Sequence, residues 1–242
     1  MAEFSAQNMT MCINETLMTE YASSASGESS IDMLDTTSLS DTLARVYKAG
    51  LQTHTIGFNG MHDIDQEAIL DALVGAATAV IVSIAVEPGA ADASVAYITQ
   101  GRISNFERFG SIGEIAPYSL SIQGTDWLGR GQVFKAATLT STANGAVSQL
   151  GALSATQTMW SALHVYGTVT GTNPTLDVTV ESDDNGTPST PVVRITHAQL
   201  TVAGSELLSY AGAQTDDYWR GVYTITGTAT PTFKILHCMA IV

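Results

Sequence analysis

The sequence predicts a mainly β protein, in which an antiparallel β-sandwich or barrel with one packed helix is followed by a second all-β sandwich domain. Short runs of alternating apolar and polar residues recur along most of the chain, which is typical of strands with one buried face. Only one stretch combines helical periodicity with capping residues. The 242 residues are 45% hydrophobic and only 13% charged, so the chain can bury a core in each of two domains.

The first part of the chain is expected to be irregular. Residues 1–30 are predicted to form an N-terminal arm, because their apolar residues show no clear period and a small polar run follows them. Residues 35–50 are predicted to form a long loop with a helical turn. The charged residues of this loop are Asp35, Asp41, Arg45 and Lys48.

The predicted helix covers residues 63–75 and follows an alternating strand over residues 50–60. Asp63 can cap its first turn, with Gln66 three residues later, and Gly75 can end it. A single narrow apolar stripe is expected to pack on a sheet. The residues of this stripe are Ile69, Ala72, Leu73 and Ala76.

Further strands are predicted after the helix, over residues 78–86, 94–99, 102–109 and 115–124. In the last of them Tyr118, Leu120 and Ile122 alternate with polar residues, so one face is expected to be apolar and the other polar. The residues of the polar face are Ser119, Ser121 and Gln123.

A change of composition over residues 135–146, which are rich in Thr, Ser, Ala and Gly, predicts a linker between two domains. Residues 147–242 are predicted to form a jelly-roll or immunoglobulin-like sandwich, because short strands alternate with turns such as Asn185-Gly186. The expected strands cover residues 157–170, 176–181, 192–195, 200–202, 218–227 and 232–242.

The order of these elements resembles the major tail tube proteins of long-tailed phages. A strand ending in Gly-Phe, an acidic-capped helix, an apolar strand, a strand pair through residues 103–107 and a Ser-rich alternating strand follow one another. The resemblance extends upstream to the Asp-, Thr- and Ser-rich residues 31–42 and covers about residues 28–134. Residues 215–220 and the final strand resemble a β-sandwich module appended to various phage structural proteins.

The resemblance implies a structural virion protein whose six-fold rings stack into a tail tube, with a tube domain over residues 31–134 and a decoration domain over residues 147–242. It implies that the arm reaches a neighbouring subunit and that the loop docks on the next ring, where Arg45 and Lys48 meet acidic groups. The polar face with Ser119 is expected to line the lumen. The ring count stays open, and two tandem tube-like domains in a three-fold ring are an alternative.

The partners that the resemblance implies are further copies of the chain, the tail terminator and baseplate proteins. The tape measure protein and then DNA would pass through the lumen without specific binding. The protein would be assembled in the host cytoplasm and located in the virion. The sequence shows neither a signal peptide nor an apolar run long enough to span a membrane.

The formal net charge is −14, of which residues up to Lys135 carry −10 and the remainder −4. A conventional nucleic-acid binder needs a basic footprint to neutralise phosphates, and this chain has none. The acidity is typical of simple solubility, or of a wall that repels DNA and lets it pass.

No catalytic site, cofactor or metal is expected from the pattern of reactive residues. Cys12 and Cys238 lie at opposite ends of the chain and predict neither a disulfide framework nor a metal site. The five histidines lack the pairing and Cys spacing of metal ligands. Asp216 and Asp217 are adjacent and would point to opposite faces of a strand, which disfavours joint acid–base work.

Two features leave alternatives open. Glu181, Asp183 and Asn185 have the spacing that begins a calcium loop, but Val192 occupies the position of the expected bidentate carboxylate, and Asn185-Gly186 also favours a hairpin turn. The aromatic residues of the second domain either fill its core or form a sugar-stacking platform, so the alternative function is a carbohydrate-binding protein of the virion surface. These aromatic residues are Trp160, Tyr166, Tyr210, Tyr218, Trp219 and Tyr223.

Overall fold

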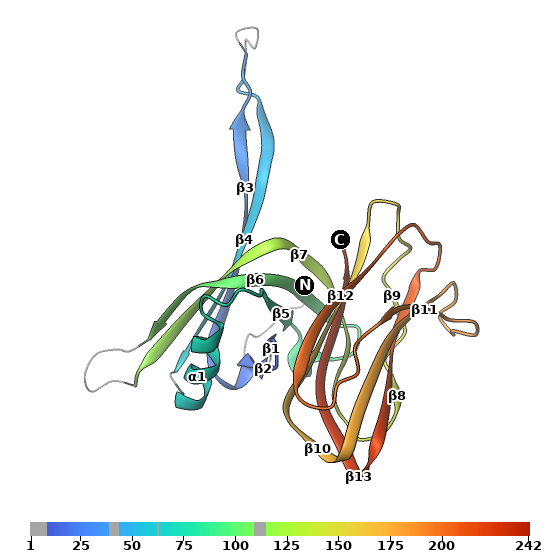
Figure 1. Cartoon of the computed structure of the whole chain (residues 1–242). Coiled ribbons are helices and arrows are strands. Elements are labelled where there is room, and N and C mark those ends of the chain that lie inside the picture. The colour runs from blue at the N-terminus through green and yellow to red at the C-terminus, as the bar shows by residue number, and fades with distance from the viewer. Residues whose placement is uncertain (1–8, 39–43, 62, 109–114) are drawn as a thin grey trace.

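The computed structural model describes residues 9–38, 44–61, 63–108 and 115–242, and it confirms the mainly β class with one α-helix among the described residues. Two lobes lie side by side, and a long hairpin projects from the N-terminal one (Figure 1). No helix in the described ranges is long and apolar enough to cross a membrane. The elements are β1 (Thr10–Ile13), β2 (Thr16–Leu17), η2 (Met18–Glu20), β3 (Ala22–Asp35), β4 (Tyr47–Met61), α1 (Ile64–Leu73), β5 (Val80–Ala85), η3 (Pro88–Ala90), β6 (Val95–Arg108), β7 (Pro117–Leu139), β8 (Ala143–Asn144), β9 (Ser148–Gln149), β10 (Thr158–Asp183), β11 (Val192–Thr196), β12 (Gly204–Ala211) and β13 (Tyr218–Ile241).

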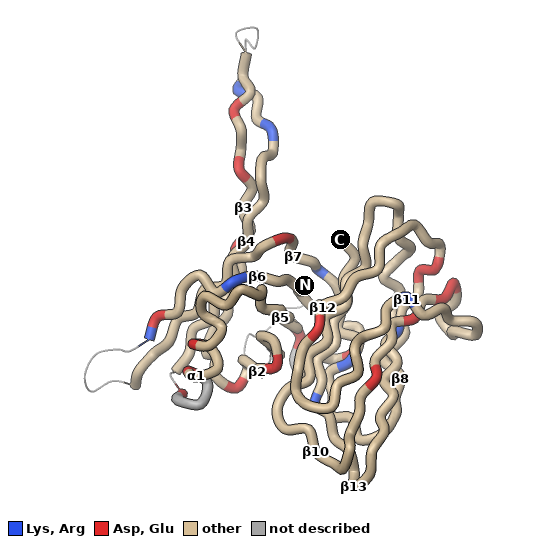
Figure 2. Tube along the Cα trace, viewed as in Figure 1, with Lys and Arg blue, Asp and Glu red and all other residues tan. Residues whose placement is uncertain are grey.

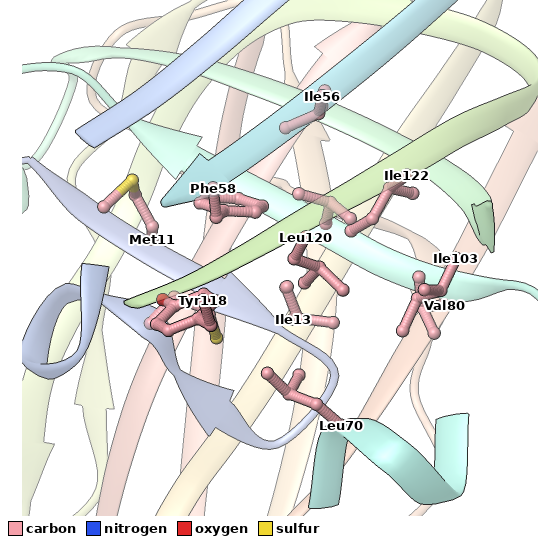
Figure 3. Packing of buried hydrophobic residues seen from close by; sticks show 12 residues of the cluster. Met11, Ile13, Ile56, Phe58, Leu70, Val80, Ile103, Tyr118, Leu120 and Ile122 are labelled. Atoms are coloured by element: carbon pink, nitrogen blue, oxygen red, sulfur yellow. The ribbon is translucent and has the colours of Figure 1, made fainter. Parts of the chain in front are cut away.

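The N-terminal lobe is an antiparallel sheet in the order β3-β4-β7-β6-β5-β1-β2. Its core brings Phe58 of β4 and Leu120 of β7 together with Ile13 of β1 and Leu70 of α1, all of them fully or almost fully buried (Figure 3). Alternation along β4 and β7 supplies one apolar side chain at every second residue, so the core follows from the period of two.

β7 joins the two lobes within one sheet. Its first part pairs with β4 on one edge and β6 on the other, and its last part pairs with β13 through Leu139↔Phe233 to Gln132↔Met239. Residues 135–139 of the predicted linker therefore continue a strand. Small Thr and Ala side chains suit a strand whose neighbours pack closely, and their low hydrophobicity concealed it from the pattern.

The C-terminal lobe is a sandwich built around one folded ribbon. β10 and β13 pair along almost their whole length, from Met159↔Ile241 to Asp183↔Tyr218. The ribbon bends where the register shifts, between Tyr166 and Thr175, so its two halves lie in opposite sheets. β12 and β7 extend one half, and β11, β8 and β9 extend the other. Side chains from both halves then form common cores.

The two lobes also meet at His164 of β10. Its Nδ1 lies 2.6 Å from the carbonyl oxygen of Asn14, and its Nε2 lies 2.8 Å from Ser83 Oγ. Because a carbonyl oxygen only accepts, Nδ1 carries the proton and Nε2 accepts the Ser83 hydroxyl. Burial lowers the pKa of His164 to about 4, so the imidazole is neutral in this contact.

Several local predictions were wrong. In the predicted arm, residues 10–13 form β1 inside the sheet, where Met11 and Ile13 are buried, and residues 22–30 belong to β3. The helix presents Leu70 and, as predicted, Leu73 to the core, whereas Ile69 is 44% exposed. Arg108 of β6 pairs with Glu67 and Asp71 of the helix. β12 was missed, and residues 200–202 contribute only a single bridge.

Candidate functional site

The hairpin of β3 and β4 is the most unusual surface of the molecule. The two strands pair from Ala22↔Gly60 to Asp35↔Tyr47. Only residues 55–61 of β4 also pair with β7, so beyond Thr55 the hairpin is a two-stranded ribbon that projects from the lobe (Figure 1). An isolated two-stranded ribbon is marginally stable in water and gains stability when another surface packs against it.

The projecting ribbon carries apolar side chains that the chain itself leaves uncovered. In the described part of the chain fourteen large hydrophobic residues are exposed, and six belong to this ribbon, with Leu51 at 78% and Met33 at 62%. Ile31 and Met33 share one face with Tyr47, because Tyr47 lies opposite Asp35. Clustered exposed apolar residues mark interaction surfaces. The six residues are Ile31, Met33, Leu34, Val46, Tyr47 and Leu51.

The predicted loop over residues 35–50 is the outer end of this hairpin. Arg45 Nη1 lies 3.8 Å from Asp35 Oδ2, and both side chains are largely in solvent. Hydrogen bonds from Thr37 lower the pKa of Asp35, which keeps it ionised. Lys48 lies opposite Leu34. Asp41 lies outside the described residues.

β3 also has a free edge, since β4 is the only strand that pairs with it in the described chain. A long strand with one unpaired edge offers backbone N–H and C=O groups to another chain. Beside its base lies an open cavity of about 470 Å³, lined mainly by apolar groups of β3, β4, β5 and β7 such as Ala25, Ile56, Ile84 and Leu128.

The alternation predicted for β7 is confirmed. Tyr118, Leu120 and Ile122 are at most 3% exposed. Ser119, Ser121 and Gln123 lie on the other face and are partly exposed. Gln123 Nε2 donates to the carbonyl oxygen of His54 at 2.9 Å, and its Oε1 accepts from Thr55 Oγ1 at 3.1 Å. That this polar face lines a lumen stays a prediction.

The candidate calcium loop is organised by its own hydrogen bonds. Asp183 accepts the N–H groups of Asn185, Ser189 and Thr190 at 3.0 to 3.2 Å, and Glu181 pairs with Arg220 at 2.7 Å. These carboxylates are satisfied without a cation, and the described residues hold no cluster of metal ligands. The structure favours the turn.

Asp216 and Asp217 likewise have separate partners. Asp216 accepts from Ser182 at 2.6 Å and from Arg194 at 2.9 Å, and these contacts lower its pKa, Ser182 most of all. Asp217 accepts from Gln149 at 2.6 Å. The two carboxylates do not face a common point, as the sequence indicated.

A buried relay in the C-terminal lobe has the distances of a nucleophile triad. His197 Nδ1 donates to Glu206 at 2.9 Å, so its Nε2 accepts the hydroxyl of Ser161 at 2.8 Å. Ser161 in turn accepts from His237 Nε2 at 2.7 Å, and Tyr223 donates to His237 Nδ1 at 2.7 Å.

This relay stabilises the core and offers no reactive group. Each hydrogen donates to a defined acceptor, and Ser161, His237 and Tyr223 are fully buried. Burial lowers the pKa of His197 and His237, so both are neutral. Sequence reasoning missed the relay because its hydrogen-bonded members are 9 to 76 residues apart and only the folded lobe brings them together.

The aromatic residues of the C-terminal lobe do not form one platform. Trp219 and Tyr223 are fully buried. Trp160 is half-buried against Trp127 of β7, with 4.7 Å between the ring centroids. Tyr210 lies under Arg194, and Tyr166 faces the N-terminal lobe.

Comparisons with known proteins found similarity to solved structures only. No family model matches it, and no curated protein does. A solved virion of a native gene transfer agent particle contains a chain with TM-score 0.43 and 14% identity, over 52% of this chain and 97% of that one. The SPP1 tail tube has a TM-score of 0.42 and 12% identity, and the match covers 54% of this chain and 80% of that one. The SPP1 Dit protein, described as a hub of the adsorption apparatus, has a TM-score of 0.41 and 14% identity, and the match covers 97% of this chain and 99% of that one.

Proposed function

We propose that this chain is a structural virion protein whose copies assemble into stacked hexameric rings, which form the tube of a phage tail and an acidic conduit for DNA. The observation that carries the proposal is the β3–β4 hairpin, whose apolar side chains are left exposed by the described part of the chain. The order of strand, helix and returning strands that resembles tail tube proteins supports the same function and suggests the six-fold count.

The hairpin and the edge of β3 supply two kinds of contact. Copies joined along strand edges satisfy the unpaired backbone groups and form a ring when the rotation closes. The projecting hairpin then contacts the next ring. This contact is heterologous, because hairpin and receiving surface are different parts of the chain, and such contacts propagate into filaments.

The charge of the chain suits a conduit. With nine basic and 23 acidic residues, a tube of these subunits repels phosphates and lets DNA and the tape measure protein pass. The small polar residues Ser119, Ser121 and Gln123 are proposed to face the lumen. The C-terminal lobe is proposed to decorate the outside, and the tail terminator and baseplate proteins to bind the two ends.

Negative-stain electron microscopy of the purified full chain at rising concentration tests the proposal. Rings or tubes with a central hole are the expected result, and their symmetry gives the ring count. Particles that stay monomeric up to the highest soluble concentration, with saturable binding to a glycan array, would replace the proposal with the carbohydrate-binding alternative.

A further inference from the structure

A second open cavity lies between the two lobes. Its volume is about 450 Å³, and it is lined on one side by β2, η2 and α1 and on the other by β7, β10 and β13. Glu15, Glu20 and Ile69 line the first side, and Tyr166 and Lys234 line the second. The lining of the cleft thus combines charged and apolar side chains.

The charged groups of this cleft are uncompensated. Glu15, Glu20 and Lys234 are exposed, and none of them forms a salt bridge within the described residues. Ile69 is 44% exposed on the same helix whose Leu70 is fully buried. The first side of the cleft therefore combines two free carboxylates with an uncovered apolar group, and the second side adds one free ammonium.

The hairpin carries the complementary groups. Lys48 lies near its outer end, opposite the exposed Leu34. Arg45 lies at the same end, where its Nη1 is 3.8 Å from Asp35 Oδ2. Asp32 lies one residue before Met33 and is also exposed. Figure 2 shows the basic residues of the hairpin at one end of the molecule and acidic residues around β2 and α1 at the other.

The hairpin and several of the elements that line the cleft lie at opposite ends of the molecule. In Figure 1 the hairpin projects away from one end of the N-terminal lobe, whereas β2, α1 and the bend of β10 and β13 lie at the other end. The eight residues 28–35 extend roughly 26 Å at the rise of a β-strand, which is enough to enter a neighbouring molecule. A translation along the hairpin therefore brings the outer described part of the ribbon, residues 33–38 and 44–48, toward the β2 and α1 end of a second copy.

We propose that the cleft between the lobes receives the β3–β4 hairpin of a second copy of this chain. Lys48 and Arg45 lie against Glu15 and Glu20 of that copy, and Asp32 lies near its Lys234. The apolar hairpin residues cover Ile69. This inference rests on the proposed stacking and adds its receiving surface, and it gives the C-terminal lobe a part in the stack because Tyr166 and Lys234 belong to it.

Charge reversal at exposed positions tests the pairing in the full chain. The single variants Lys48→Glu, Glu15→Lys and Glu20→Lys are expected to reduce stacking about ten-fold, measured by sedimentation velocity and by tube length in electron micrographs. Combining Lys48→Glu with either cleft variant is expected to restore it. Asp184→Lys is the matched control, since Asp184 is exposed in a distant turn.

Cysteine cross-linking tests the same contact by distance. Cys12 and Cys238 are fully buried, so introduced thiols react selectively. A chain with both Lys48→Cys and Glu20→Cys is expected to give a ladder of disulfide-linked multimers on a non-reducing gel. A chain with Lys48→Cys and Asp184→Cys is expected to give none.

The outcomes separate this inference from the function on which it rests. Rescue by the reciprocal charges together with the ladder supports the cleft as the receiving surface. If the three single variants form tubes as well as the wild-type chain does, the cleft is not the receiving surface, although the tube function still stands. The same holds if the chain with Lys48→Cys and Glu20→Cys forms tubes but gives no ladder. Failure of the wild-type chain to form rings or tubes overturns both.

Discussion

Two long antiparallel ribbons of the molecule differ in how far their apolar side chains are buried. The ribbon of β10 and β13 bends over itself and buries residues such as Leu163, Leu176 and Phe233 between its halves. The ribbon of β3 and β4 stays extended and leaves Met33 and Leu51 in solvent. Both are antiparallel two-stranded ribbons, so the difference lies in whether the apolar side chains find a partner among the described residues of the same chain.

The largest difference is expected in stability. Phe233→Ala removes a fully buried ring from the folded ribbon and should lower the free energy of unfolding by about 3–5 kcal/mol. Leu51→Ala, at a side chain that is 78% exposed, should change it by less than about 0.5 kcal/mol. Urea denaturation of unassembled protein measures both. Equal losses would show that the hairpin is packed within its own chain.

Acid should act on the folded ribbon through His164. Its pKa is about 4 when folded and near 6.5 when unfolded, so the unfolded chain binds the proton first as the pH falls. Stability should therefore be present above pH 6.5 and decline toward pH 4, with a contribution from this residue of about 3 kcal/mol.

The measurement is the free energy of unfolding against pH for the wild-type chain and His164→Gln. The variant should have a shallower decline, although His54, His197 and His237 also have pKa values lowered by burial and add to it. Parallel curves for the two proteins would mean that the pKa of His164 is the same in the folded and in the unfolded chain.

The bend itself depends on glycine. Gly171 has a φ of +110°, and a Cβ there would lie 2.8 Å from Pro231 Cα. Gly171→Ala should cost about 1–3 kcal/mol of stability. Gly27 of β3 has nothing within 4 Å of a Cβ and an ordinary strand conformation, so Gly27→Ala should be neutral or slightly stabilising. Thermal melts of the two variants compare a folded with an extended ribbon.

Periodicity predicted the features that depend on one strand or one helix alone. The alternation through Tyr118 and Leu120 and the presence of the helix were confirmed, because both follow from local periodicity. The buried stripe of the helix was predicted only in part: Leu73 packs against the core, but Leu70 is buried in place of Ile69. Its contacts with Arg108, through Glu67 and Asp71, join residues about forty positions apart and have no local signal.

The hairpin shows a second limit. Ile31, Met33 and Leu34 lie among Ser and Asp residues, and such an exposed strand has no alternating burial for a pattern to detect. Residues 10–13 are too few to show a period, yet β5 supplies the partner that makes them a strand. The candidate assembly surface could thus be found only once the tertiary contacts showed what remained uncovered.

The smallest effect on stability is expected for the exposed charges of the hairpin. Arg45 and Asp35 lie 3.8 Å apart in solvent, and an exposed pair of this kind contributes little to the stability of the fold. Arg45→Ala should leave the melting curve of the unassembled chain unchanged within error, and added salt should not alter it. The same variant should weaken assembly, and salt should weaken wild-type assembly as well, because the hairpin acts between molecules. If Arg45→Ala instead lowered the melting temperature by several degrees while assembly was unaffected, the charges of the hairpin would serve its own fold, and the contrast between the two ribbons would be lost.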